Sequence, residues 1–330
     1  MSETNAKNIS GKSAISFMKF RKLAMSFSLI LIIISLVSLS VKGLKFGLDF
    51  TGGTQVEVEY DKPADLTKVR QQLADAGHDD AVVVYFGVET EILIRLQAED
   101  SQAADRTQVG QEDEGSSDQS LGDEIISVLE ADGSKVTLKR IEFVGPQVGD
   151  ELREDGGLGM LFALLVVMGY VAFRFQYKFS VGAVVALIHD VIIVLGVFSI
   201  LGLDFDLTVL AAVLAVIGYS LNDTIVVADR IRENFRRVRQ SSPLEIIDIS
   251  LNETLGRTLM TSLTTLLVLF ALFFVGGELI RGFSIALIVG VGIGTYSSIY
   301  VAANILLLMG LTPQDLIEPV KEGSEVDDMP

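Results

Sequence analysis

The chain of 330 residues contains no cysteine and no tryptophan, and it has two histidines, His78 and His189. Without cysteine the protein can form neither a disulfide nor a thiolate metal site. Two histidines are too few for a histidine-rich metal site. The sequence also lacks a phosphate-cradling glycine loop and a recognisable nucleophile triad. We therefore expect a protein that is not an enzyme and that carries no cofactor.

Basic residues are also scarce, because 26 Lys and Arg stand against 43 Asp and Glu, which gives a formal net charge of −17. The acidic excess gathers between residues 42 and 155, so it belongs to one part of the chain. A surface of this sign repels phosphate, and we do not expect nucleic acid as a partner.

Long apolar runs, in contrast, are abundant, and 49% of the residues are hydrophobic. A helix needs about 20 largely apolar residues to cross a membrane. Six segments meet this requirement: 23–41, 157–177, 179–201, 207–228, 257–276 and 283–311. We expect a membrane all-α bundle of six transmembrane helices, of which the last five follow one another closely.

The short loops predict how these helices are oriented. Clusters of Lys and Arg precede the first helix, flank the turn after the second and follow the fourth, so all of them fall on one side. Because basic loops stay in the cytoplasm, the segment 1–22 and the acidic tail 312–330 are predicted to be cytoplasmic, in a bacterial inner membrane. The triplet 38–40 resembles a signal-peptide cleavage site, but the apolar run before it is longer than that of a usual signal, and Lys42 follows.

Residues 42–156, between the first two helices, are predicted to form a periplasmic α+β domain. Alternating apolar residues indicate strands, and apolar residues at helical spacing indicate helices. In chain order the segments are strand 54–60, helix 63–76, strand 81–87, strand 91–96, helix 121–131 and strand 136–144. This βαββαβ order is typical of ferredoxin-like domains. The polar stretch 97–118 is predicted to be a disordered insertion.

An ionisable side chain inside an apolar run is expected to have a functional or structural role, because a charge at the bilayer centre costs about 2.5–3.5 kcal/mol. Asp223 and its neighbour Asn222 lie inside the fourth run. One interpretation is a carboxylate that takes up and releases protons. The other is a carboxylate fixed in a buried ion pair with Arg257, at the start of the fifth run. We favour proton exchange, because burial and a nearby cation change the proton affinity of an acid in opposite directions.

The fifth run carries hydroxyl groups at helical spacing beside Arg257, among them Thr261 and Thr264. Such a stripe is expected to face another helix or water rather than lipid, although each threonine can also bond to its own helix backbone. His189 and Asp190 in the third run fit either a proton relay or a hydrogen bond between helices. We assign to a proton pathway Asp223, Arg257, Asn222, Thr261, Thr264 and Asp190.

Small residues recur every four positions along the sixth run, and they include Gly282, Gly290 and Gly294. Small residues at this spacing let two helix backbones approach closely. We assign these glycines to helix packing and give this helix no chemical role.

Four motifs lie beside or inside the apolar runs: FGLDFTGGT (46–54), VGPQVGDEL (144–152), GYSLNDTIVVADRIREN (218–234) and NETLGRTLMTSLTTLL (252–267). Together they resemble the SecF members of the SecD/SecF family of protein-export membrane subunits. The resemblance implies an RND-like membrane fold, with Asp223 as the proton-carrying aspartate and Arg257 as its partner. It also implies four partners, namely SecD, the SecYEG channel, YajC and an unfolded preprotein, with a second carboxylate on SecD.

The resemblance and the intramembrane carboxylate together predict a function. We expect an accessory subunit of the Sec protein translocase that, with SecD, uses the proton motive force to promote late-stage preprotein translocation, with protons as the coupling ion. Two alternatives stay open. An RND-like exporter of small molecules or lipids would need a substrate portal and larger paired domains. A passive scaffold that stabilises the translocation channel would tolerate the loss of Asp223 and Arg257.

Overall fold

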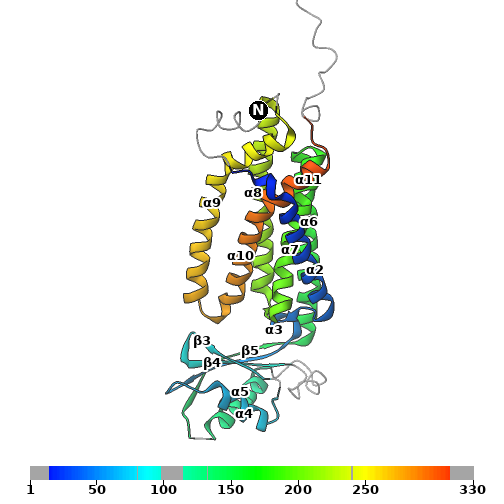
Figure 1. Cartoon of the computed structure of the whole chain (residues 1–330). Helices are drawn as coiled ribbons and strands as arrows, with labels where there is room; N and C mark the ends of the chain where they lie inside the picture. The colour runs from blue at the N-terminus through cyan, green and yellow to red at the C-terminus, as the bar shows by residue number, and fades with distance from the viewer. Residues whose placement is uncertain (1–14, 80, 98–113, 132, 239–240, 313–330) are drawn as a thin grey trace, which may run out of the picture.

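The computed structural model describes residues 15–79, 81–97, 114–131, 133–238 and 241–312. It consists of a bundle of long helices with a four-stranded sheet and two shorter helices at one end (Figure 1). The first described helix begins at the end of the bundle opposite the sheet. Most of the segments that we predicted to be cytoplasmic, 1–14 and 313–330, lie outside the described residues.

Six helical segments in the described part of the chain are long and apolar enough to cross a membrane. They are α2 (Arg21–Val41, preceded by η1 at Phe17–Phe20), α6 (Pro146–Arg174), α7 (Tyr177–Leu201), α8 (Leu207–Arg237), α9 (Pro243–Val275) and α10 (Glu278–Ser297) with its continuation through η4 (Ser298–Ala302) and α11 (Ala303–Leu308). Each contains most or all of one of the predicted apolar runs.

Several helices extend beyond the predicted apolar runs: α6 begins at Pro146 rather than at 157, α8 ends at Arg237 rather than at 228, and α10 begins at Glu278 rather than at 283. Two further boundaries differ for local reasons. α9 begins at Pro243 rather than near residue 257, because the Ser242 hydroxyl accepts the N–H of Glu245 and the Glu245 carboxylate accepts the N–H of Ser242. This reciprocal capping box satisfies two backbone donors at the start of the helix, and it does not depend on the membrane. α6 ends at Arg174 rather than at 177, because Phe175 has an extended backbone.

The last membrane helix is not one continuous α-helix. Between α10 and α11 the five residues of η4 form a π-helix. π-Turns are rare and frequently occur at functional sites. The helical segment ends at Leu308, a little before the predicted end at 311.

The α+β part consists of β2 (Gly53–Tyr60), α4 (Leu66–Asp75), β3 (Val82–Phe86), β4 (Val88–Gln97), α5 (Glu114–Glu130) and β5 (Val136–Val144). The strands pair antiparallel in the order β3-β4-β2-β5. Alternate residues of the central strands, such as Val56 and Ile94, are buried beneath Leu73 of α4 and Ile125 of α5. Both helices lie on the face of the sheet that points away from the bundle (Figure 1).

Three predicted boundaries in this part are corrected. The stretch 97–118 is not wholly disordered, since Gln97 ends β4 and residues 114–118 belong to α5, while 98–113 lie outside the described residues. α5 therefore starts earlier than residue 121. α4 starts later than residue 63, because the Asp65 carboxylate accepts the N–H of Thr67 and so begins the helix at Leu66.

A compact junction ties the sheet to the bundle. β1 (Lys45–Phe46) pairs in parallel with β6 (Asp204–Phe205), just before α8. The Asp204 carboxylate forms ion pairs with Lys45 at 2.8 Å and with Arg95 of β4 at 3.0 Å. Asp49, in the short helix α3 (Leu48–Thr51), accepts the N–H of Leu207 at 3.0 Å. The start of α8 is therefore held directly by the chain that enters the sheet.

Candidate functional site

Asp223 lies within α8, and it is directed into the bundle, where it is 6% exposed. Its Oδ2 accepts a hydrogen bond of 3.0 Å from the hydroxyl of Ser298, the first residue of the π-helix η4. Thr258 of α9 is also buried beside this carboxylate. The acid that the sequence placed inside the membrane therefore faces hydroxyl groups of two neighbouring helices.

Asp190, on α7, is fully buried and accepts three hydrogen bonds. Its Oδ1 contacts Nδ1 of His189 at 2.8 Å, and its Oδ2 accepts from the hydroxyls of Ser220 and Ser297 at 2.5 and 2.7 Å. Ser220 belongs to α8 and Ser297 to α10, so this carboxylate joins three helices. Asp190 is therefore held by side chains of three helices, whereas Asp223 accepts from the hydroxyl of Ser298.

Two adjacent serines connect the carboxylates. Consecutive residues of a helix point about 100° apart, so Ser297 can reach Asp190 on α7 while Ser298 reaches Asp223 on α8. Sequence reasoning missed both serines because it gave the last membrane helix no chemical role. The available signal was Ser298 itself, which continues the four-residue repeat of Gly290 and Gly294.

The glycines of α10 make this arrangement possible by letting α10 lie close against α8. A Cβ at Gly282 would lie 2.9 Å from Cγ2 of Val209, and a Cβ at Gly294 would lie 3.2 Å from Cβ of Ser220. At Gly290 a Cβ would overlap the Val216 side chain. All three glycines assigned to packing thus lie against α8, and they bring the two serines within hydrogen-bonding range of the carboxylates.

The other predicted pathway residues lie on the outside of this chain. Arg257 and Asn222 are exposed, and no ion pair joins Arg257 to Asp223 in the described part of the chain. The structure therefore contradicts the alternative of a buried ion pair. Thr261 and Thr264 are exposed too, and their hydroxyls bond to the carbonyls of Arg257 and Met260 on their own helix. They do not contact either carboxylate here.

Among the described residues, no three His, Asp or Glu side chains come together in a way that could hold a metal ion.

Ser298→Ala is predicted to destabilise the folded protein by about 1–3 kcal/mol, because it leaves the buried carboxylate of Asp223 without its donor. Ser284→Ala is the matched control, since Ser284 is equally buried on the same helix but bonds to its own backbone carbonyl, of Ile280. Thermal unfolding of the purified variants measures the difference. Equal midpoints for the two variants would contradict the assigned contact.

Comparison with known proteins identifies the family. The family model described as "Protein export membrane protein SecD/SecF, C-terminal" matches residues 124–312, and the "SecD/SecF GG Motif" matches 37–64. The "Protein translocase subunit SecF" of Pseudomonas aeruginosa is 52% identical over 318 residues, which cover 96% of this chain and 98% of that relative. The chain belongs to the SecF family. The same subunit of Vibrio alginolyticus is 48% identical over 325 residues, with 98% of this chain and 99% of that relative covered.

Solved structures agree with this assignment. The crystal structure of SecDF, a translocon-associated membrane protein from Thermus thermophilus, matches with a TM-score of 0.76 at 37% identity over 90% of this chain. SecDF in a super-membrane-facing form matches with a TM-score of 0.66 at 36% identity over the same share of this chain. This SecF-family chain spans 39% of each SecDF chain. The resemblance seen in the sequence is confirmed, and the chain is a multi-pass membrane protein and an accessory subunit of the protein translocase.

Proposed function

We propose that this SecF-family subunit couples the proton motive force to late-stage preprotein translocation, and that Asp223 is the group in this chain that exchanges the protons. The observation that carries the proposal is the position of Asp223, buried within the bundle and bonded to a hydroxyl at the start of a π-helix. A proton that crosses the membrane releases about 2.3 kcal/mol per 100 mV, which is enough to shift the balance between two conformations.

The exposed polar side chains next to this site support a partner that carries the other half of it. Arg257, Asn222, Thr261 and Thr264 are exposed on α8 and α9, within segments apolar enough to lie in the membrane. An arginine facing lipid is expensive, so this side is proposed to be covered by SecD, which would bring a second carboxylate. Asp190 is proposed to belong to the same polar network.

The orientation and the α+β part complete the proposal. The basic loops support cytoplasmic termini in the bacterial inner membrane, which places the sheet in the periplasm. The strand order β3-β4-β2-β5, with both helices on one face, supports a ferredoxin-like domain. The further partners that we propose are SecYEG, YajC and an unfolded preprotein on the periplasmic side. The proposed coupling ion is the proton.

The junction between the sheet and α8 offers a mechanical route from the proton site to the periplasm. Asp223 lies on α8, and the first residue of α8 donates its N–H to Asp49, close to the start of the sheet. Asp204, just before α8, holds Arg95 of the sheet. A shift of α8 on protonation of Asp223 would therefore be passed directly to the periplasmic domain.

Arg257→Met is expected to reduce both proton flux and gradient-dependent export severalfold, because it removes the cation that acts on Asp223. The measurement uses membrane vesicles that contain this chain with SecD and the channel, with and without a proton gradient. Arg257→Lys, which keeps the charge, should retain part of the activity, and Arg281→Met in the first turn of α10 should have little effect. Full gradient-dependent export by Arg257→Met, with the complex intact, would leave the passive scaffold as the better account.

A further inference from the structure

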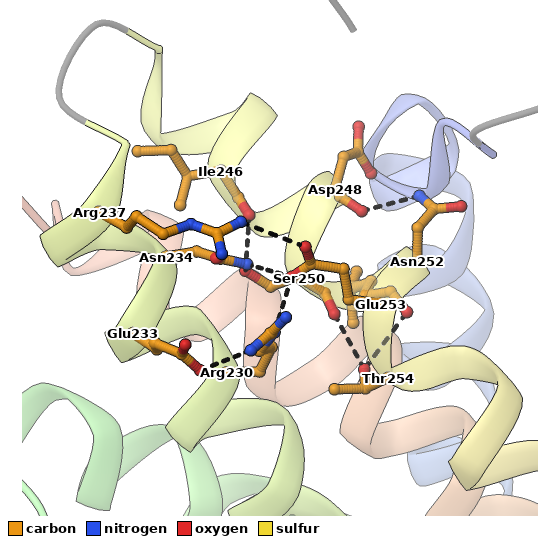
Figure 2. Close-up of polar contacts among 11 residues, drawn as sticks. Arg230, Glu233, Asn234, Arg237, Ile246, Asp248, Ser250, Asn252, Glu253 and Thr254 are labelled. Atoms are coloured by element: carbon orange, nitrogen blue, oxygen red, sulfur yellow. Dashed lines mark hydrogen bonds and ion pairs between the residues drawn. The ribbon is translucent and has the colours of Figure 1, made fainter. Parts of the chain in front are cut away.

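A polar cluster joins the end of α8 to the start of α9 at the end of the bundle opposite the sheet (Figure 2). The Glu253 carboxylate of α9 accepts hydrogen bonds from Nε of Arg230 at 2.7 Å and from Nδ2 of Asn234 at 2.6 Å, both on α8. Arg237 of α8 lies 3.6 Å from the same carboxylate. We call Glu253 with Arg230, Asn234 and Ser250 the Glu253 clamp.

The interior of the clamp is sealed from solvent. Asn234 and Ser250 are both fully buried, and Nδ2 of Asn234 also donates to the Ser250 hydroxyl at 3.0 Å. Ser250 in turn donates to the carbonyl of Ile246, one turn earlier on α9. Nδ2 of Asn234 thus bonds to both Ser250 and Glu253, while its Oδ1 has no hydrogen-bond partner among the described residues. Buried hydrogen bonds between helices favour one specific arrangement of those helices. The clamp therefore fixes α9 against α8 in both height and rotation.

The opposite side of α9 is held as well. The Asp248 carboxylate accepts the N–H of Met18 at 2.9 Å, and the Asn252 amide both accepts the N–H of Ile15 at 2.9 Å and donates to its carbonyl at 2.8 Å. Met18 belongs to η1 and is itself buried. Figure 2 shows Asp248 and Asn252 on the side of α9 that faces away from the arginines. This end of α9 is thus anchored from two directions.

Arg257 lies one helical turn after Glu253 on α9. The contacts that anchor this end of α9 therefore also fix the position of Arg257. At about 1.5 Å per residue, Arg257 lies about 6 Å nearer the sheet than Glu253, and Asp223 lies about 10 Å nearer the sheet than Arg230. The two functional residues therefore differ in height by about 4 Å, which an arginine side chain can span. A second contact, from the Ser262 hydroxyl to Tyr219 and Thr295, holds α9 on the far side of Arg257.

We propose that the Glu253 clamp is a positioning element that sets the height and rotation of Arg257 relative to Asp223. Glu253 touches no proton-carrying group and acts through the helix that carries Arg257. The proposal rests on the proposed function in one respect, that Arg257 acts on Asp223 during proton transfer. It assigns a role to three further residues of the two long motifs, in addition to Asp223 and Arg257. They are Arg230, Asn234 and Glu253.

The test compares Glu253→Ala with Glu233→Ala. Both glutamates pair with Arg230, but Glu233 does so within α8, at 2.6 Å, and is 56% exposed against 21% for Glu253. Because the chain has no cysteine, spin labels can be placed on single cysteines introduced at the exposed positions Ala215 of α8 and Leu263 of α9. Pulsed electron paramagnetic resonance then reports the distance between the two helices.

Glu253→Ala is expected to shift or broaden the α8–α9 distance and to lower proton flux severalfold in vesicles with SecD. Glu233→Ala should change neither, and Glu253→Gln, which keeps an acceptor oxygen for Arg230 and Asn234, should recover most of both. An unchanged distance in Glu253→Ala would overturn the positioning role. If the distance changed and the proton flux did not, the positioning role of the clamp would stand. That result would instead contradict the action of Arg257 on Asp223.

Discussion

Asp223→Asn is expected to reduce proton flux through the complex with SecD to the level of vesicles that lack this chain. Asparagine is nearly isosteric and keeps an oxygen that can accept from Ser298, so α8 and η4 retain their contact. It cannot bind or release a proton in the range that a membrane gradient covers. Export that depends on the gradient should fall to the same extent, while the part of export that proceeds without a gradient remains.

Asp229→Asn is the matched control for this result, because Asp229 lies on the same helix and pairs with the partly exposed arginines Arg174 and Arg232 at 3.6 and 3.4 Å. Exposed ion pairs contribute about 0–1 kcal/mol, so this variant should keep both flux and export. Gradient-dependent export that persists in Asp223→Asn would show that this carboxylate is not the coupling group.

Gly290→Leu is predicted to be the most destabilising substitution on α10, at about 3 kcal/mol, because even a Cβ at this position would overlap Val216 of α8. The helices would have to separate, and Ser297 and Ser298 would then lose their contacts with Asp190 and Asp223. The variant is therefore expected to lose both thermal stability and proton flux, as measured by unfolding in detergent and by transport in vesicles.

Gly292→Leu separates the effect of this contact from the general effect of a larger side chain. Gly292 lies two residues further along the same helix, and a Cβ there would meet no atom within 4 Å. Leucine at this position should leave the midpoint of unfolding close to that of the unmodified protein. If Gly292→Leu and Gly290→Leu lowered the midpoint equally, the close approach of α10 to α8 would not be the cause.

The membrane segments could be located from the sequence because the bilayer imposes a single requirement on every span, namely a long apolar run. The ends of the helices could not be located in this way, because side chains that cap the backbone decide where a helix begins. Ser242 starts α9 well before the apolar run begins, and Asp65 starts α4 later than the predicted residue 63. The strands of the α+β part were located closely, because alternation along a half-buried strand depends on neighbouring residues alone.

The sequence by itself determined that Asp223, Asp190 and Arg257 lie within or beside apolar runs, because a charge in such a run is conspicuous without any knowledge of the fold. Only the tertiary structure decided which groups meet. Asp190, Ser220 and Ser297 come from three helices, and helical spacing does not say which face turns inward. The threonines of α9 have the same spacing as buried residues, yet Thr258 faces Asp223 and Thr261 faces outward. Which faces meet depends on contacts between residues far apart in the chain, such as the approach of the α10 glycines to α8.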